Sequence, residues 1–288
     1  MEKLKIIECP RDAMQGIIDF IPTEKKISYI NQLLKCGFDT LDFGSFVSPK
    51  AIPQLKDTVD VLNKLDLSNT DTNLLAIIAN ERGAEEAVQF DEIDFLGFPF
   101  SVSETFQMRN TNSTIQESWS RLEAIQNLAF KNNKDLVVYL SMGFGNPYGD
   151  IWNSDIVIGR AERLYNELGV KILALSDTIG CATPTLVSSL FKDLIPSLKN
   201  VEFGAHLHTI PENAKQLVEA AYNHGCRRFD GAIKGFGGCP MATNDLTGNM
   251  PTELMLLWFQ ENGIVTGIKN QEFNSSFEMS NSIFPRHI

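Results

Sequence analysis

The feature that most constrains this chain is a regular alternation of short apolar runs and longer amphipathic segments. Eight runs have the length and residue types of buried β-strands, at Leu4–Glu8, Thr40–Phe43, Leu74–Ile78, Glu92–Leu96, Leu136–Ser141, Lys171–Ser176, Glu202–Leu207 and Arg227–Ile233. Helix-periodic segments follow them, near residues 23–36, 50–65, 81–89, 114–132, 154–168, 184–196, 211–224 and 251–262. Strands that alternate with helices predict a parallel sheet, and eight such units are the repeat that closes into a barrel.

An open, doubly wound sheet would show the same alternation, so the pattern alone does not decide the fold. The 288 residues fit one (β/α)8 barrel of roughly 250 residues. We therefore predict an α/β protein of the TIM-barrel type over residues 1–267, with its active site at the C-terminal rim of the strands. Residues 268–288 are polar and poorly periodic, so they are predicted as a C-terminal tail without assigned structure.

Composition excludes several classes of protein. The 36 acidic and 25 Lys and Arg residues give a net charge of -11, which argues against a nucleic-acid partner. Apolar runs stay below the ~20 residues that span a bilayer, and the first residues leave no room for a signal peptide, so we expect no membrane partner. The five cysteines lack a CxxC spacing and indicate reduced thiols. We expect a cytoplasmic protein.

Polar residues gather where the predicted strands end. These residues are Arg11 and Asp12 after the first strand, Asp42 at the end of the second, Ser141 at the fifth, Asp177 at the sixth, His206 and His208 at the seventh, and Cys239 in the glycine-rich loop after the eighth. In a barrel these strand ends converge on one rim, where such enzymes keep their active sites. This convergence favours an enzyme over a binding module.

A metal site is predicted at this rim. His206 and His208 lie two positions apart on a strand, which places both imidazoles on one face. Together with Asp12 and an amide such as that of Asn249, they offer nitrogen and oxygen ligands that suit Mg²⁺ or Mn²⁺ better than structural zinc. The alternative is that both histidines are packed or surface residues without a metal.

Structural explanations exist for the other candidates as well. Arg11 and Asp12 can form a buried salt bridge, and Asp42 can do no more than orient Arg11. Cys239 can be an inert thiol, although its place between a glycine and a proline at the rim favours a reacting group on a moving loop. Asp177 can simply cap the helix that follows it.

Several sequence strings, in order along the chain, resemble those of 3-hydroxy-3-methylglutaryl-CoA (HMG-CoA) lyases, members of the DRE-TIM metallolyase group. The strings are Pro10-Arg11-Asp12 with Gln15, Ser45-Phe46-Val47-Ser48-Pro49-Lys50, Asp177-Thr178-Ile179-Gly180, His206-Leu207-His208, Gly235-Phe236-Gly237-Gly238-Cys239-Pro240 and Thr247-Gly248-Asn249. They extend over nearly the whole predicted barrel. The loop with Cys239 is specific to the lyases, whereas the Arg-Asp and His-x-His elements are shared with related synthases and aldolases.

The resemblance implies a divalent-metal-dependent carbon–carbon lyase that cleaves HMG-CoA to acetyl-CoA and acetoacetate, a reaction of leucine breakdown and ketone metabolism. It also implies residue roles. The implied metal ligands are Asp12, His206, His208 and Asn249; Arg11 would stabilise the enolate oxygen, Cys239 would be the loop thiol that protonates the enolate carbon, and Asn110 with Arg109 would contact the CoA portion. The base that takes the hydroxyl proton is Asp12 or His206. We also expect a homo-oligomer, most simply a dimer.

The chain departs from the family pattern at three places. Asp42 stands where the family has a glutamate that partners the arginine, and Thr209 with Pro211-Glu212 replaces the Asp and Tyr-Gly that follow the second histidine. The first turn reads Glu8-Cys9-Pro10 in place of Val-Gly-Pro. These departures leave room for a related lyase or aldolase acting on another hydroxyacyl-CoA. A non-catalytic ligand-binding barrel is the other alternative, although a binding protein has no need of the thiol.

Overall fold

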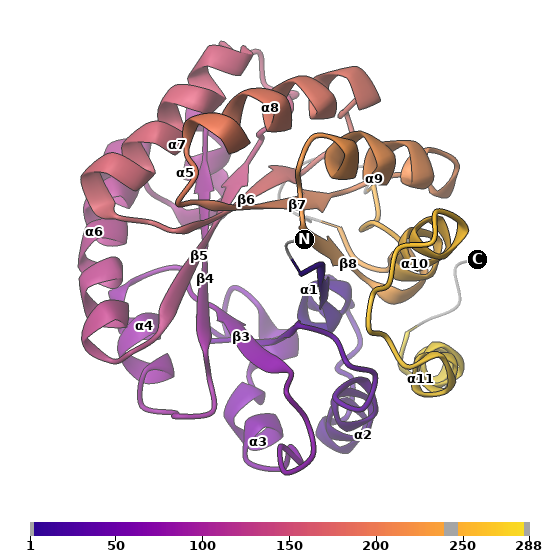
Figure 1. The fold of residues 1–288 in the computed structure, drawn as a ribbon. Coiled ribbons are helices and arrows are strands. Elements are labelled where there is room, and N and C mark those ends of the chain that lie inside the picture. Colours follow the sequence, from indigo (N-terminus) through magenta and orange to yellow (C-terminus); the bar gives the residue numbers. More distant parts are fainter. Residues whose placement is uncertain (1–2, 239–246, 285–288) are drawn as a thin grey trace.

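A computed structural model describes residues 3–238 and 247–284, and its centre is a closed parallel barrel (Figure 1). Neighbouring strands pair in sequence order, and β8 returns to pair with β1. The strands are β1 (Lys5–Glu8), β2 (Thr40–Ser45), β3 (Asn73–Ile77), β4 (Phe95–Ser101), β5 (Asp135–Ser141), β6 (Ile172–Asp177), β7 (Glu202–Leu207) and β8 (Arg228–Gly231). The predicted (β/α)8 fold is confirmed.

Helices surround the barrel on its outside (Figure 1). The α-helices are α1 (Pro10–Gln15), α2 (Thr23–Leu33), α3 (Thr58–Leu62), α4 (Glu81–Ala87), α5 (Glu104–Thr111), α6 (Ile115–Lys131), α7 (Ser154–Leu168), α8 (Pro184–Ser197), α9 (Ala214–Asn223), α10 (Thr252–Glu261) and α11 (Asn270–Ile283), and the 3-10 helices are η1 (Pro53–Leu55), η2 (Pro211–Asn213) and η3 (Ile233–Gly235). The larger apolar core lies between this layer and the outer face of the strands. Within the described residues, no helix is long and apolar enough to cross a membrane.

The second strand differs from its prediction in a way that matters for the site. Asp42 was expected at the end of this strand, but β2 continues to Ser45 and Asp42 lies inside it. The pairing with β3 shifts register between Asp42 and Gly44, which is a β-bulge. A bulge bends a strand and re-aims its side chains, and local residue preferences do not predict it. The predicted position of Asp42 at the strand end was therefore wrong.

Other elements also have boundaries that differ from the predicted ones. The fourth strand was predicted at Glu92–Leu96, but β4 begins at Phe95 and continues through Pro99, which pairs with Tyr139 of β5. Proline argues against a strand in sequence analysis, because it donates no hydrogen bond to the ladder. The long helix predicted near residues 50–65 is divided into η1 and α3.

The C-terminal segment, left without structure by the sequence, contains helix α11. It packs against α2, where Gln32 Nε2 donates to Glu272 Oε2 at 2.9 Å. At its far end Phe284 stacks on Phe236, with 4.5 Å between the ring centroids. Phe236 lies at the start of the glycine-rich loop, so α11 helps to fix the base of that loop. The division at residue 267 stays a prediction.

Candidate active site

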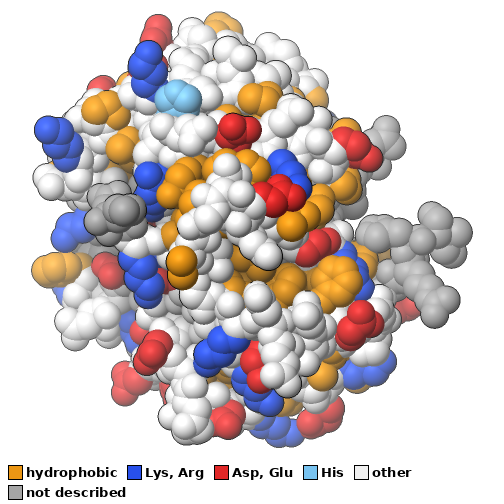
Figure 2. All heavy atoms as spheres, turned by 45° about the vertical axis from the view of Figure 1, so that its right-hand side comes forward, with side chains coloured by type: hydrophobic (Ala, Val, Ile, Leu, Met, Phe, Trp, Pro, Cys, Tyr) orange, Lys and Arg blue, Asp and Glu red, His pale blue; other side chains and the backbone are white. Residues whose placement is uncertain are grey.

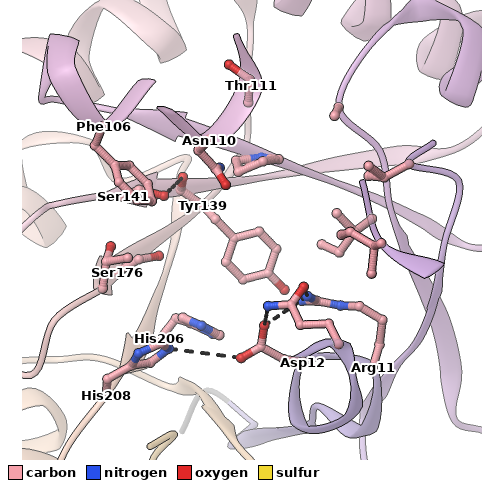
Figure 3. Close-up of a pocket in the computed structure, with 17 residues that line it drawn as sticks. Arg11, Asp12, Phe106, Asn110, Thr111, Tyr139, Ser141, Ser176, His206 and His208 are labelled. Carbon is pink, nitrogen blue, oxygen red and sulfur yellow. Dashed lines mark hydrogen bonds and ion pairs between the residues drawn. The ribbon is translucent and has the colours of Figure 1, made fainter. Parts of the chain in front are cut away.

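A pocket opens at the C-terminal ends of the strands and holds most of the predicted site residues (Figure 3). Its volume is about 760 Å³, including space open to solvent. The lining residues are Arg11, Asp12, Gln15, Val47, Ile52, Ile77, Ala79, Pro99, Phe106, Asn110, Thr111, Tyr139, Ser141, Ser176, Thr178, His206 and His208. The pocket therefore combines an apolar wall with one concentrated group of charged and imidazole side chains.

Arg11 and Asp12 lie on the short helix α1, which begins one residue after β1 and has Pro10 in its first turn. Arg11 is buried, and its Nε lies 3.0 Å from both carboxylate oxygens of Asp42. Its Nη1 donates to Asp12 Oδ1 and to Gln15 Oε1, each at 2.8 Å. The contact expected between Asp42 and Arg11 is present, and the guanidinium plane is held on two sides.

Burial and charge act on these groups in opposite directions. Burial raises the pKa of Asp42 to about 6, although the nearby Arg11 opposes the rise. Burial also favours the neutral form of Asp12, but the charge of Arg11 and both site histidines outweigh it and lower its pKa to about 2. Asp12 is therefore ionised at neutral pH, as a metal ligand needs to be.

His206 lies in β7, and His208 follows the strand directly, with 5.5 Å between the ring centroids. Asp230 of β8 faces His206 across the barrel interior, with 3.1 Å between Oδ2 and Nδ1. Burial and the neighbouring His206 lower the pKa of His208 to about 4, so its imidazole is neutral at neutral pH. A neutral imidazole presents the lone pair that binds a cation.

Asp12, His206 and His208 together fit a metal ion. One ligand atom of each lies within 4.8 Å of the others, and all three side chains line the pocket. Asn249 joins them, because its Nδ2 donates to Asp12 Oδ2 at 2.7 Å and a bridge pairs its backbone with that of His208. An ionised carboxylate, neutral imidazole and an amide form a donor set for a hard or borderline divalent cation.

A second group of possible ligands shares His206 with this set. Cys9, His206 and Asp230 also bring one ligand atom each within 4.8 Å. However, burial and the surrounding carboxylates raise the pKa of Cys9 well above its ordinary value, so the thiol stays protonated. Neither Cys9 nor Asp230 is among the described residues that line the pocket. The Asp12 group is the better metal site.

The other predicted site residues differ in whether they lie at the pocket. Asn110 lines the pocket from α5, whereas the neighbouring Arg109 lies over the ring of Tyr148 at 4.7 Å. Asp177 accepts hydrogen bonds from the backbone of Cys181 at 3.0 Å and Ala182 at 2.7 Å, which is the structural role of capping a turn. Cys239 lies outside the described residues.

Several residues that the structure places at the site had no predicted role. Gln15 donates to Asp12 Oδ1 at 2.7 Å, and the ring centroid of Tyr139 lies 5.2 Å from that of His206. Tyr139 could have been found, because it stands two positions before Ser141 on a strand that is otherwise apolar up to that serine. Asp230 could have been found from its charge inside a predicted strand.

The barrel and the ligand cluster at its rim define an enzyme of the metal-dependent TIM-barrel class, and comparison with known proteins narrows that class. The HMGL-like family model matches residues 3–279. Hydroxymethylglutaryl-CoA lyase YngG of Bacillus subtilis is 34% identical over 267 residues, covering 93% of this chain and 88% of the relative. The mitochondrial hydroxymethylglutaryl-CoA lyase of Rattus norvegicus is 31% identical, covering 94% and 82%.

A solved structure agrees with these relatives. An HMG-CoA lyase from Acinetobacter baumannii, in complex with coenzyme A and 3-methylmalate, superposes with a TM-score of 0.89 at 31% identity, covering 98% of this chain and 91% of that one. The chain belongs to the HMGL-like family. The family predicted from the sequence strings is confirmed.

Proposed function

We propose that this enzyme is a divalent-metal-dependent carbon–carbon lyase that cleaves HMG-CoA to acetyl-CoA and acetoacetate. One observation carries the proposal: a charged arginine and a set of possible metal ligands lie at the same pocket. The arginine is Arg11, held by Asp42, and the ligands are Asp12, His206 and His208. Membership of the HMGL-like family and the names of the relatives support the same reaction. The enzyme acts on an acyl-CoA, as the coenzyme A bound to the similar structure also suggests.

Asp12, His206, His208 and Asn249 are the proposed metal ligands. A bound Mg²⁺ or Mn²⁺ would polarise the substrate oxygens and make the tertiary hydroxyl more acidic. The fixed contacts of Asp12 with Arg11, Gln15 and Asn249 keep its carboxylate in one orientation. Asp12 or His206 takes the hydroxyl proton, since both lie at the pocket wall.

Arg11 stabilises the negative charge that develops on the thioester oxygen as the carbon–carbon bond breaks. It can do so because Asp42 and Asp12 hold the guanidinium group before the substrate arrives. Burial alone would lower the pKa of Arg11, but these two carboxylates outweigh it and raise the pKa above its ordinary value, so the group stays charged. The charge is thus present wherever the enzyme is folded.

Asn110 is proposed to contact the CoA portion, because it lies on the pocket wall at the end of α5. Arg109 on the same helix is proposed to add a cation for the CoA phosphates. The departure at Thr209 lies away from this wall: Thr209 donates to the carbonyl of Ile210 at 3.1 Å and is not among the described lining residues. Asp42 is also absent from the described lining and reaches the pocket only through its contact with Arg11. The changes at Thr209 and Asp42 therefore replace no described lining residue, which favours HMG-CoA over a different hydroxyacyl-CoA.

One assay tests this function. Purified protein is incubated with HMG-CoA and either Mg²⁺ or Mn²⁺, and acetoacetate is measured; excess EDTA is the control. We expect acetoacetate only when metal is present. Full turnover in excess EDTA would exclude the metal-dependent mechanism, and turnover of other 3-hydroxyacyl-CoA esters without HMG-CoA cleavage would favour the related lyase. Comparison of the two metals identifies the better cofactor.

Cys239 is proposed, from the resemblance, as the thiol that protonates the enolate carbon. We expect Cys239→Ser to lower kcat by about 100-fold or more and to change substrate affinity little. Thiol reagents would inactivate the enzyme unless substrate is bound. Alkylation of Cys239 with activity intact would show that the thiol has a structural role. A dimeric state and a cytoplasmic location are also proposed, and sedimentation and cell fractionation test them.

A further inference from the structure

The barrel interior beneath the metal cluster is polar along β7 and β8. Gly204 and His206 of β7 pair in register with Arg228 and Asp230 of β8. Alternate residues of a strand point to the same face, so these four positions form two layers. In the lower layer a Cβ added at Gly204 would lie 3.1 Å from Arg228 Cδ, which shows that Arg228 fills the place of the missing side chain.

Arg228 is fully buried, yet its guanidinium group is only partly paired. Nη1 donates to Glu202 Oε1 at 3.2 Å, and Lys5 Nζ donates to the other oxygen of Glu202 at 2.6 Å. Nε and Nη2 of Arg228 find no hydrogen-bond partner within residues 3–238 and 247–284. Leaving charged donors buried and unpaired costs several kcal/mol, so a native protein satisfies them.

Two unsatisfied groups near Arg228 complement these donors, and both act electrostatically on its guanidinium group. Asp230 uses Oδ2 for His206, while its Oδ1 has no partner in the described part of the chain. The hydroxyl of Tyr139 is likewise buried and unpaired there, and its ring packs edge-on to that of His206. Two N–H donors, one carboxylate acceptor and one hydroxyl are therefore buried in the same part of the barrel interior. Buried polar groups of this kind are usually joined by ordered water.

We propose that Arg228, Tyr139 and Asp230 enclose bound water inside the barrel, and that Arg228 positions the His206 imidazole through this water and Asp230. Asp230 then keeps the proton of His206 on Nδ1 and leaves Nε2 directed to the cation. Such partners of a ligand histidine fix its tautomer and orientation. Both ring nitrogens of His206 are then engaged, so Asp12 is the one of the two proposed bases that takes the hydroxyl proton. The inference rests on the proposed function in one respect, because His206 is a metal ligand there.

The first test uses the metal-free protein. A crystal structure at high resolution is expected to show water within about 2.7–3.2 Å of Arg228 Nε or Nη2 and of Asp230 Oδ1. Nitrogen NMR of labelled histidine is expected to show His206 as the Nδ1–H tautomer. An interior without water at these atoms, or the Nε2–H tautomer, would overturn the proposal. Neither measurement needs metal or substrate, so both remain decisive if the lyase assay fails.

The second test separates positioning from mere packing. Arg228→Met keeps an apolar stem of similar length and removes the guanidinium group. We expect the Kd for Mn²⁺ to rise about tenfold or more and the His206 tautomers to become mixed. The matched control is Arg227→Met, since this neighbouring arginine donates instead to the carbonyls of Tyr222 and Cys226. Equal Mn²⁺ affinity and an unchanged tautomer in a folded Arg228→Met protein would contradict the proposal.

A milder variant covers the case in which Arg228→Met does not fold. Gly204→Ala keeps every charge but places a methyl group 3.1 Å from Arg228 Cδ, so the arginine stem must move by a few tenths of an ångström, and we expect the guanidinium group to move with it. We expect the same changes in Mn²⁺ Kd and tautomer as in Arg228→Met, at a smaller size. A folded Gly204→Ala protein with wild-type values for both would overturn the positioning role of Arg228.

Discussion

The two halves of the barrel interior are lined by different kinds of side chain. From β3 to β6 the interior is lined by Leu75, Ile77, Val137, Ile172 and Ala174, with Tyr139 at its edge. From β7 through β8 and β1 to β2 it carries charged and imidazole groups instead, and these groups hold one another by hydrogen bonds. Asp42 and Arg228 of the polar half are as fully buried as Leu75 and Val137 of the apolar half, so burial alone does not decide what the interior contains.

This difference indicates that the apolar half contributes mainly to stability and the polar half mainly to chemistry. Apolar side chains stabilise by packing and need no specific partner; a Cβ added at Gly97 would lie 2.5 Å from Ile77 Cδ1, which shows how closely they fit. Each polar group in the other half needs a partner of the right kind at the right distance. Changes in the apolar half are thus expected to alter stability, and changes in the polar half to alter metal binding and turnover.

The largest effect is expected at the ligand cluster. His208→Ala removes a proposed ligand and is expected to raise the Kd for Mn²⁺ by more than about 100-fold, with turnover lost at ordinary metal concentrations. His224→Ala is the matched control, because this histidine lies at the end of α9, where its Nδ1 is 2.8 Å from the carbonyl oxygen of Ala220. Calorimetric titration with Mn²⁺ checks the result. Equal affinity in the two variants would remove His208 from the metal site.

Asp42 separates orientation from metal binding within the polar half. Asp42→Ala leaves Arg11 without the carboxylate that holds its Nε and Nη2. We expect kcat to fall by about 100-fold, whereas the Kd for Mn²⁺ changes little. Asp42→Glu is expected to be poorly tolerated, since a site closed around the shorter residue has little room for a methylene. Steady-state kinetics with near-wild-type kcat for Asp42→Ala would show that something else orients Arg11.

A change in the apolar half is expected to lower stability and to leave metal binding unchanged. Leu75 is fully buried among the interior side chains of β3 to β6. Leu75→Ala is expected to lower the free energy of unfolding by about 2–5 kcal/mol, because it removes packed atoms and leaves a cavity. The folded variant would keep wild-type affinity for Mn²⁺. Denaturant titration and calorimetry check both parts, and weakened metal binding without loss of stability would break the distinction between the halves.

An effect that depends on pH concerns a buried carboxyl on the outer face of β1. Burial raises the pKa of Glu8 from 4.5 to about 8, although it accepts hydrogen bonds from Ile233 N and Thr252 Oγ1. The folded protein therefore holds this proton more tightly than the unfolded chain. The stabilisation is complete below pH 4.5, declines as the pH rises, and is lost above about pH 8.

Glu8→Gln tests this pH dependence, because glutamine keeps an acceptor oxygen and cannot ionise. The variant is expected to lose less stability than the wild type between pH 5 and pH 9, and each kcal/mol of difference moves Tm by about 2–4 °C. Melting curves across this range check it. Parallel pH profiles for the two proteins would mean that Glu8 does not titrate in the range.

Much of the fold could be predicted from sequence, because each strand and helix has its own local pattern and the strand–helix unit repeats eight times. Alternating strand and helix patterns predict a parallel α/β fold, and a chain of this length with polar residues at the strand ends favours the barrel over an open sheet. The rule that strand ends share one rim then brings Asp12, His206 and His208 together from the sequence alone. Bulges and partners cannot be predicted in this way. The placement of Asp42 inside β2 depends on pairing with β3, and the contact of Asp230 with His206 depends on register between β7 and β8.

The docking of α11 has a consequence for the way in which heat would inactivate this enzyme. The helix forms no strand pairing and lies outside the barrel against α2 (Figure 1), so it can detach while the barrel hydrogen bonds remain intact. Figure 2 turns this side of the molecule forward and shows apolar side chains at the surface among charged ones. Such partial opening needs less free energy than global unfolding. Detachment would release Phe236 from Phe284 and with it the base of the glycine-rich loop. Catalysis would then cease some degrees below the melting of the barrel, and amide protons of α11 would exchange with solvent before those of β5.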